Sequence, residues 1–169
     1  LVTEPARDGG KIVVARKGVA RYVLTAHGRP AHSGARHEEG RSAILELARQ
    51  IVDLEAMTDY ARGTTVNVGQ IGGGTADNVV PQLAWANIDM RVATIADADA
   101  MHLKMKSLKA YNADVTLEVS GGLNRPPYEQ NDGVTKLFAH ARALARGLDI
   151  DLVGVTTGGG SDGNFTAQM

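Results

Sequence analysis

The side chains best suited to chemistry in this sequence lie in two loops and at the end of one strand. His32 and His37 occupy the loop RPAHSGARHEEG. An imidazole near neutral pH can donate a hydrogen bond to an oxyanion or a carboxylate, and His32 is the candidate for that role. The spacing of five residues on a loop matches no common zinc signature, so we interpret His37 as structural, with Glu38 and Glu39 at the solvated start of a helix.

Two further side chains could bind a polar group of a ligand. The Arg91 guanidinium, in the segment DMRV, could hold a carboxylate through two parallel hydrogen bonds, or it could pair with Asp89 on the same strand face. Same-face neighbours lie about 7 Å apart along a strand, which weakens the second alternative. Asn78, in GGTADNVVP, could be a neutral donor or simply a residue favoured in turns.

The glycine-rich segment GGGSDGN near the end contains Gly159 and Gly160. Its backbone amides could bind an anion or a nucleotide, or it could be a flexible turn; the P-loop pattern is absent. Ser161 and Asp162 do not indicate a hydrolase triad, because the GxSxG elbow is missing. Glu4, which precedes a proline, is a candidate oxygen ligand for a metal ion.

The hydrophobic pattern predicts the elements that must position these residues. Alternating segments indicate strands, and periodic segments indicate amphipathic helices, in the order strand 11–18, strand 20–27, helix 41–57, strand 64–71, strand 82–92, helix 97–109 and strand 114–120. From residue 20 to 120 this βαββαβ order predicts an α+β, ferredoxin-like sandwich, with an antiparallel sheet and two helices on one face. We expect GGLNRPP to break regular structure before a helix near 134–145 and a final strand.

The two ends of the chain are too short to form cores of their own. We therefore expect residues 1–18 and 126–169 to belong together in an incomplete α/β catalytic domain, into which the sandwich of residues 19–125 is inserted. The sequence starts with neither Met nor a signal peptide, and we expect it to be part of a longer polypeptide.

The predicted topology fixes where the candidate residues lie. If the sandwich strands are ordered 4-1-3-2, His32 and Asn78 leave the sheet at the same tip. Arg91 and both connections to the flanking segments lie at the opposite end, about 25 Å away for strands of about eight residues.

Composition excludes several classes of protein. The 18 Lys and Arg residues balance 19 Asp and Glu residues, so no overall positive field favours nucleic acid. The absence of cysteine excludes disulfides, thiolate nucleophiles and Cys-based zinc sites. No apolar run approaches the roughly 18 residues that a membrane-spanning helix needs, so no membrane partner is predicted.

Taken together, the ordered motifs resemble a known family. TEPA, RPAHSGARHEEGRSA, GGTADNVVP, DMRV, RPP and GGGSDGN are similar to the dinuclear-zinc metallopeptidase family of glutamate carboxypeptidase, aminoacylase and succinyl-diaminopimelate desuccinylase. The resemblance spans essentially all 169 residues and is greatest to glutamate carboxypeptidase. It implies a catalytic domain with two zinc ions, interrupted by a lid domain through which subunits form homodimers.

The resemblance also implies roles for single residues. Glu4 matches a zinc ligand, His32 the lid imidazole that crosses to the partner's active site, and Asn78 its companion. Arg91 matches the arginine that holds the substrate carboxylate, with Arg125, Gly159 and Gly160 near the same group. The implied reaction is hydrolysis of the amide bond of an N-acylated amino acid or peptide, often with a C-terminal glutamate, in which His32 stabilises the tetrahedral oxyanion.

The family's remaining metal ligands have no counterpart in this sequence. A lone carboxylate does not hold zinc against water, so this chain by itself is expected to bind no zinc and to be inactive. The alternative to an enzyme part is an interaction module, in which a sheet edge or a helix face forms a two-fold dimer without chemistry of its own.

Overall fold

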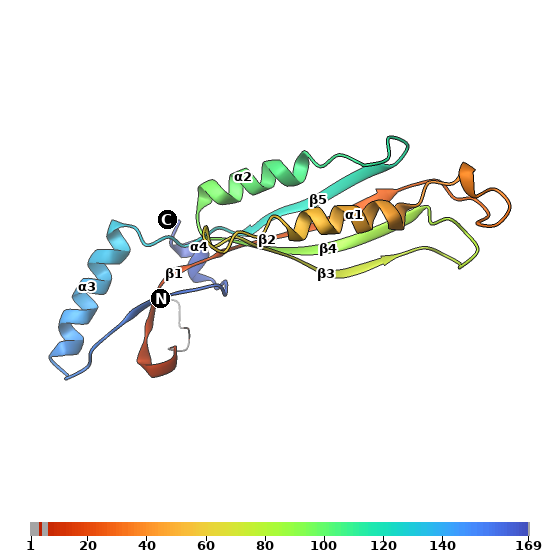
Figure 1. Ribbon diagram of the computed structural model, residues 1–169. Helices are drawn as coiled ribbons and strands as arrows, with labels where there is room; N and C mark the ends of the chain where they lie inside the picture. The colour runs from red at the N-terminus through yellow and green to blue at the C-terminus, as the bar shows by residue number, and fades with distance from the viewer. Residues whose placement is uncertain (1–3, 5–6, 169) are drawn as a thin grey trace.

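The molecule consists of an elongated arm, residues 18–125, standing on a smaller base, residues 7–17 and 126–168 (Figure 1). The computed structural model describes residue 4 and residues 7–168. The arm contains β2 (Gly18–His27), α1 (Ala43–Glu55), β3 (Thr65–Gly73), β4 (Leu83–Val92), α2 (Ile95–Lys106) and β5 (Thr116–Arg125). The base contains β1 (Ile12–Arg16), α3 (Asp132–Arg146), β6 (Gly154–Thr157) and α4 (Gly163–Thr166), and short 3-10 turns cover Asp8–Gly10 and His37–Glu39.

The four strands of the arm form one antiparallel sheet in the order β3-β4-β2-β5. β4 pairs with β2 and β3, and β5 pairs with β2, each time in antiparallel orientation. Both helices lie on one face of the sheet (Figure 1). The predicted α+β, ferredoxin-like βαββαβ fold and its 4-1-3-2 strand order are therefore confirmed.

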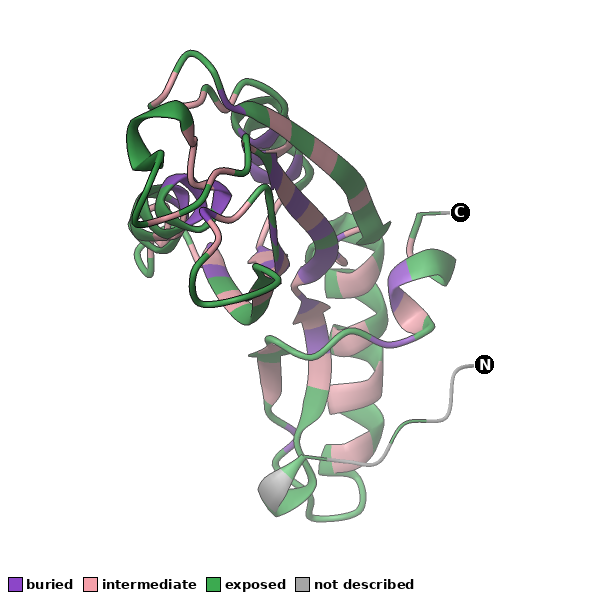
Figure 2. Ribbon diagram, turned by 90° about the vertical axis from the view of Figure 1, so that its right-hand side faces the viewer, coloured by how far each residue is buried: buried purple, intermediate pink, exposed green. Residues whose placement is uncertain are grey.

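The core of the arm follows from the alternation of its strands. Tyr22, Leu24 and Ala26 of β2 point to the helix-covered face and are buried, together with Leu54 of α1 and Met105 of α2. Figure 2 shows this buried layer between sheet and helices. The alternate residues, among them those at 21, 23, 87 and 89, lie on the other side of the sheet. None of the described helices covers this side, and we call it the open face.

Two local expectations were wrong. The segment GGLNRPP does not end regular structure, because β5 continues through Gly121 to Arg125. Gly121 has a φ of +93°, and a Cβ atom there would lie 2.2 Å from the Arg21 carbonyl oxygen, so glycine allows the strand to pass close to β2 rather than breaking it. Likewise, Glu38 and Glu39 form a separate 3-10 turn, and α1 begins only after Ser42, whose hydroxyl caps it.

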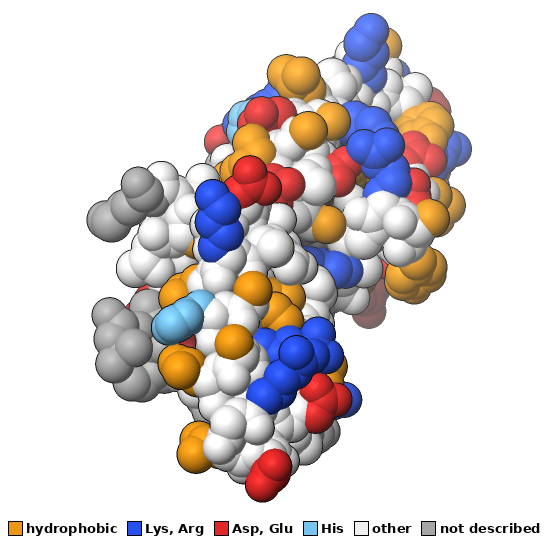
Figure 3. Space-filling model, turned by 90° about the vertical axis from the view of Figure 1, so that its left-hand side faces the viewer, with side chains coloured by type: hydrophobic (Ala, Val, Ile, Leu, Met, Phe, Trp, Pro, Cys, Tyr) orange, Lys and Arg blue, Asp and Glu red, His pale blue; other side chains and the backbone are white. Residues whose placement is uncertain are grey.

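The base brings the two ends of the chain together but forms little core. β1 and β6 pair in parallel. α3 includes the residues near 134–145 that were predicted to be helical, and it contains no buried residue. Hydrophobic side chains lie on the surface at this end of the molecule (Figure 3), including Leu137, Leu144, Leu148 and Ile150. None of the helices in the described ranges has the length and apolar character needed to cross a bilayer.

Candidate functional site

His32 and Asn78 meet at the far tip of the arm, as the topology predicts. The Ser33 amide donates to the Asn78 carbonyl oxygen at 3.0 Å, and His32 forms an isolated antiparallel bridge with Val79. Both His32 and Asn78 are exposed. Backbone pairing between the two loops therefore holds the imidazole and the amide side chain at one solvent-facing end.

The backbone around His32 selects the tautomer of its ring. The amides of Gly34 and Ala35 both donate to His32 Nδ1, each at 3.1 Å. Because Nδ1 accepts these bonds, a neutral imidazole carries its proton on Nε2. Nε2 is then a hydrogen-bond donor directed away from its own loop, which is the property that an oxyanion-stabilising group requires.

Arg91 and Arg125 lie at the opposite end of the arm, on either side of Val19. Val19 of β2 is in register with Arg91 of β4 and with Arg125 of β5. Val19 and His27 are eight residues apart along β2, and His32 lies beyond that end of the strand. At about 3.4 Å per residue, roughly 27 Å separate the row of the two arginines from the tip side of the sheet.

Arg91 and Asp89 form a two-bond ion pair, although the spacing of the two residues along the strand predicts a weak one. Arg91 Nε donates to Asp89 Oδ1 at 2.6 Å and Nη2 to Oδ2 at 3.0 Å. The long arginine side chain lies back along the strand and spans the gap that separates the two Cβ atoms. The alternation of the strand, which places both residues on the open face, was the signal for this pair.

Arg125 has a different environment. Its guanidinium lies 5.6 Å from the centroid of the Phe165 ring, and Nη2 reaches Asp162 Oδ1 at 3.4 Å. Its Nε is buried and has no hydrogen-bond partner in the described part of the chain. A buried N–H without an acceptor is costly, so this part of Arg125 is not satisfied by the described residues around it.

The glycine-rich segment approaches the same end of the arm. A Cβ atom on Gly160 would lie 2.9 Å from Val19 Cγ2 and 3.2 Å from Arg125 Cδ, so glycine permits this close contact. The Gly159 carbonyl oxygen accepts a hydrogen bond from Arg16 Nη1 at 3.0 Å. Arg91, Arg125 and Gly160 are therefore all neighbours of Val19, whereas His32 and Asn78 are not.

Two residues that the motifs did not single out hold this arrangement. Arg16 is a buried arginine of β1, and its contact with Gly159 fixes the glycine segment. Asn164 is fully buried; its Nδ2 donates to the carbonyl oxygens of Lys17 at 3.1 Å and Pro126 at 2.8 Å, and its Oδ1 accepts from the Ser161 amide at 2.8 Å. Lys17 and Pro126 lie in the two segments that connect the base to the arm. The side-chain amide of Asn164 therefore links both connecting segments to the glycine-rich segment.

The part of the chain that the structure describes contains no grouped set of metal ligands. Glu4 is exposed, and the proline after it lies outside the described residues. Over residue 4 and residues 7–168, no three His, Asp or Glu side chains are grouped as metal ligands. Ser161 Oγ accepts a hydrogen bond from the Gly163 amide at 3.1 Å, a turn contact that gives it no catalytic partner.

Comparison with known proteins places this arrangement in a family. The peptidase dimerisation domain matches residues 14–118, which is most of the arm together with the end of β1. This chain belongs to the M20 metallopeptidase family. Enzymes of the M20 family are generally metal-dependent.

The relatives are peptidases and extend well beyond the matched region. A probable carboxypeptidase of Arthroderma benhamiae is 32% identical over 132 residues, covering 68% of this M20 chain and 28% of the relative. Carboxypeptidase G2 of a Pseudomonas species is 29% identical over 173 residues, covering 99% of this chain and 41% of the relative. The crystal structure of aminopeptidase PepT from Bacillus cereus superimposes with a TM-score of 0.81 and 27% identity, covering 98% of this chain and 44% of that one. The chain spans less than half the length of each relative.

Proposed function

We propose that this chain is the lid, with flanking catalytic-domain segments, of a dimeric zinc-dependent carboxypeptidase or amidohydrolase that cleaves the amide bond of N-acylated amino acids or peptides. Residues 19–125 are the lid, and residues 1–18 and 126–169 belong to the catalytic domain. The observation that carries the proposal is the separation of His32 from Arg91 along the length of one small sheet. Two groups so far apart act on one amide bond only when they come from different subunits.

The carboxylate end of the substrate is assigned to the Arg91 row, in which Val19 stands between Arg91 and Arg125 on the open face. Arg91 and Arg125 supply guanidinium groups, which bind carboxylates through paired hydrogen bonds. The close approach of Gly160 to Val19 and to Arg125 Cδ supports this assignment. Asp89 occupies the fork of Arg91, so a substrate carboxylate replaces the Asp89 oxygens or shares Arg91 with them.

The other end of the reacting group is assigned to the tip of a second subunit. His32 of the partner subunit donates from Nε2 to the oxygen of the scissile carbonyl, where negative charge develops during attack by water. Asn78 of the partner subunit accompanies it, since the backbones of the two loops are joined. The two zinc ions implied by the family resemblance are assigned to the catalytic domain, with Glu4 as the single candidate ligand in this chain.

The edge strands favour β3 as the dimer contact. At the other edge, Lys106 Nζ donates to the Val119 carbonyl oxygen of β5 at 2.8 Å, and a lysine on an edge discourages pairing. The first half of β3 is also covered, because Thr58 Oγ1 bonds the amide and carbonyl of Val66, and Glu55 Oε1 accepts from the Val68 amide.

The second half of β3 has backbone groups on its outer edge that the described residues leave uncovered. The bond from the Gly74 amide to the Leu83 carbonyl oxygen sets the register, so the backbone groups of Ile71 and Gly73 point away from β4. Beside this edge, α1 exposes apolar side chains at Ile44, Leu45 and Val52. An unpaired strand segment flanked by an apolar helix stripe is suited to a two-fold homodimer.

Mixing of two inactive variants tests the whole proposal. In the complete protein with zinc, His32→Ala should lower kcat on an acyl-glutamate by about 10²- to 10³-fold, as expected for the loss of an oxyanion donor. Arg91→Gln should lose activity chiefly through a higher KM. If His32 acts across the dimer, subunits of the two variants that are mixed and reassociated should recover about a quarter of wild-type activity, because half the dimers are mixed and each has one intact site.

The same mixture distinguishes the alternative. If His32 and Arg91 served one subunit's site, no mixed dimer would contain an intact site and mixing would restore nothing. An interaction module without chemistry would show no amide hydrolysis in the wild type, although sedimentation would still report a dimer.

A further inference from the structure

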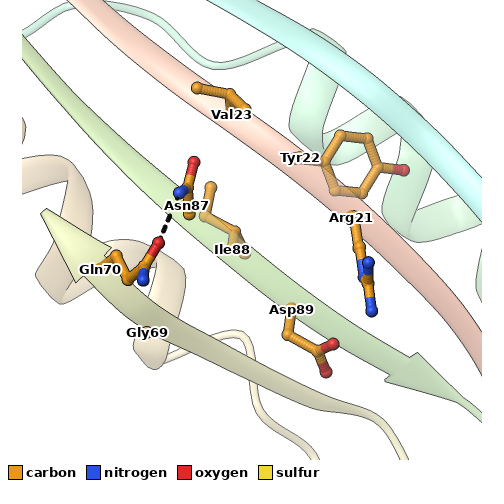
Figure 4. A pocket seen from close by; sticks show the side chains of 8 residues that line it. All are labelled: Arg21, Tyr22, Val23, Gly69, Gln70, Asn87, Ile88 and Asp89. Atoms are coloured by element: carbon orange, nitrogen blue, oxygen red, sulfur yellow. Dashed lines mark hydrogen bonds between the residues drawn. The ribbon is translucent and has the colours of Figure 1, made fainter.

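A hollow of about 400 Å³ lies on the open face beside the Arg91 row (Figure 4). It is bordered by β2, β3 and β4, and its lining residues are Arg21, Tyr22, Val23, Gly69, Gln70, Asn87, Ile88 and Asp89. Tyr22 and Ile88 belong to the core on the other side of the sheet, so they contribute backbone. The side chains that face the hollow are those of the open face.

The polar groups of the hollow are mostly paired, and Arg21 is the exception. Asn87 Nδ2 donates to Gln70 Oε1 at 2.8 Å, which leaves Gln70 Nε2 as a donor. Both oxygens of Asp89 are held by Arg91. Arg21 is exposed, and its guanidinium makes no hydrogen bond or ion pair within the described ranges, because its neighbour Asp89 is paired with Arg91. Among the residues that the structure describes, the hollow therefore presents Arg21 as a free cation and Gln70 Nε2 as an amide donor, next to the apolar surface of Val23.

The position of Arg21 relates it to the proposed carboxylate site. Arg21 stands opposite Asp89, and Val19, two residues earlier on β2, stands opposite Arg91. The two rows are about 7 Å apart along the strands. The Arg91 side chain lies back onto Asp89, so its guanidinium lies closer to the Arg21 row than its backbone does. The carboxyl carbons of a five-carbon dicarboxylate are separated by four carbon–carbon bonds of about 1.5 Å each, so its two ends reach two neighbouring guanidinium groups when contact distances are added.

We propose that this hollow is the subsite for a second carboxylate, carried by the side chain of an acidic amino acid that leaves the substrate, with Arg21 forming the ion pair and Gln70 Nε2 donating a further hydrogen bond. This inference rests on the proposed function, in which Arg91 binds the first carboxylate. Two observations carry it. The charge that the described lining residues leave free, that of Arg21, is positive, and Asp89 borders both this hollow and the Arg91 site.

The test measures binding of glutarate and of butyrate to the complete protein by calorimetry. The two probes share one carboxylate and an apolar chain, and only glutarate has the second carboxylate. Wild type should bind glutarate at least about tenfold more tightly, and Arg21→Gln should weaken glutarate binding about 10- to 100-fold while leaving butyrate unchanged. Arg21→Lys retains the charge and should keep most of the preference.

The matched control is Arg49→Gln on α1, on the helix-covered side, where Arg49 lies 5.6 Å from the Tyr111 ring centroid. It should change neither affinity. Equal affinities in wild type, or equal weakening of both probes by Arg21→Gln, would overturn the proposal. A lowered Tm in Arg21→Gln with unchanged glutarate binding would do the same, because Arg21 would then be paired with another part of the complete protein.

Hydrolysis separates this inference from the proposed function. An enzyme that cleaves an acyl-glutamate and an acyl-glutamine should lose its preference for the first in Arg21→Gln, mainly through KM. If wild type cleaves neither compound, the proposed function fails, and the glutarate and butyrate affinities still decide whether the hollow takes a dicarboxylate.

Discussion

The arm and the base are built from the same kinds of element but differ in how completely they bury them. In the arm, two helices cover one face of a four-stranded sheet, and side chains such as Leu24 and Leu54 are fully buried. In the base, two short strands and α3 pack with no buried residue in the helix. The arm therefore has a hydrophobic core of its own, whereas the base leaves apolar side chains of α3 on its surface. We propose that the rest of a catalytic domain covers this surface.

The largest expected effect is a difference between two leucine truncations in the 169-residue chain. Leu24→Ala removes a fully buried side chain from the arm and should lower the free energy of unfolding by about 3 kcal/mol. Leu144→Ala on α3, where the leucine is 62% exposed, should change it by less than about 0.5 kcal/mol. Urea unfolding followed by circular dichroism, and by the fluorescence of the single tryptophan, Trp85, measures both. Equal losses would show that base and arm share one core.

A smaller effect is expected at the joint between the two regions. Asn164→Ala removes hydrogen bonds to the Lys17 and Pro126 carbonyl oxygens and should destabilise the joint by about 2 kcal/mol. The Lys17 and Tyr128 amides should then exchange hydrogen faster, while the Leu24 amide stays protected. Asn164→Asp, which keeps the size and the acceptor but loses both donors, should behave similarly, and exposed Thr166→Ala should not. Unchanged exchange at Lys17 would show that Asn164 does not hold the joint.

The smallest effect concerns an ion pair at the end of the arm near the base. Hydrogen bonds from Arg62 and from the Thr94 hydroxyl hold the pKa of the Asp97 carboxyl below its ordinary value of 3.8. A lowered pKa in the folded state stabilises the fold above pH 3.8, and this contribution is lost as the pH falls through the lowered pKa. Asp97→Asn should therefore lower Tm at pH 7 and converge with wild type at lower pH. Exposed Asp99→Asn on the same helix is the control, and a Tm difference independent of pH would refute the assignment.

Much of the fold followed from hydrophobic periodicity. The strands and helices of the arm and their order were predicted because alternation and helical spacing are local properties of the sequence. The continuation of β5 was not, because glycine is ambiguous on its own. Only the approach of Gly121 to the Arg21 carbonyl oxygen shows that it serves a close strand pair.

The candidate site was predicted in part. Topology alone placed His32 with Asn78 and Arg91 at the other end, since strand directions follow from the order of elements. The spacing of the Cβ atoms predicts only a weak pair between Arg91 and Asp89, because this spacing does not include the length of the arginine side chain. Asn164 gave no separate signal within GGGSDGN, because its value lies in carbonyl groups more than thirty residues away in the chain.

The sequence by itself determined the alternation that buries one face of the sheet, the βαββαβ order, and the motifs that lead to the M20 metallopeptidase family. Tertiary structure decided which polar groups already have hydrogen-bond partners. Asp89 accepts from Arg91, the Val119 carbonyl oxygen on one sheet edge accepts from Lys106, and His32 Nδ1 accepts from two backbone amides. The physical reason is that periodicity depends on neighbours a few residues apart, whereas the free hydrogen-bonding capacity of a side chain depends on partners that only folding brings within about 3 Å.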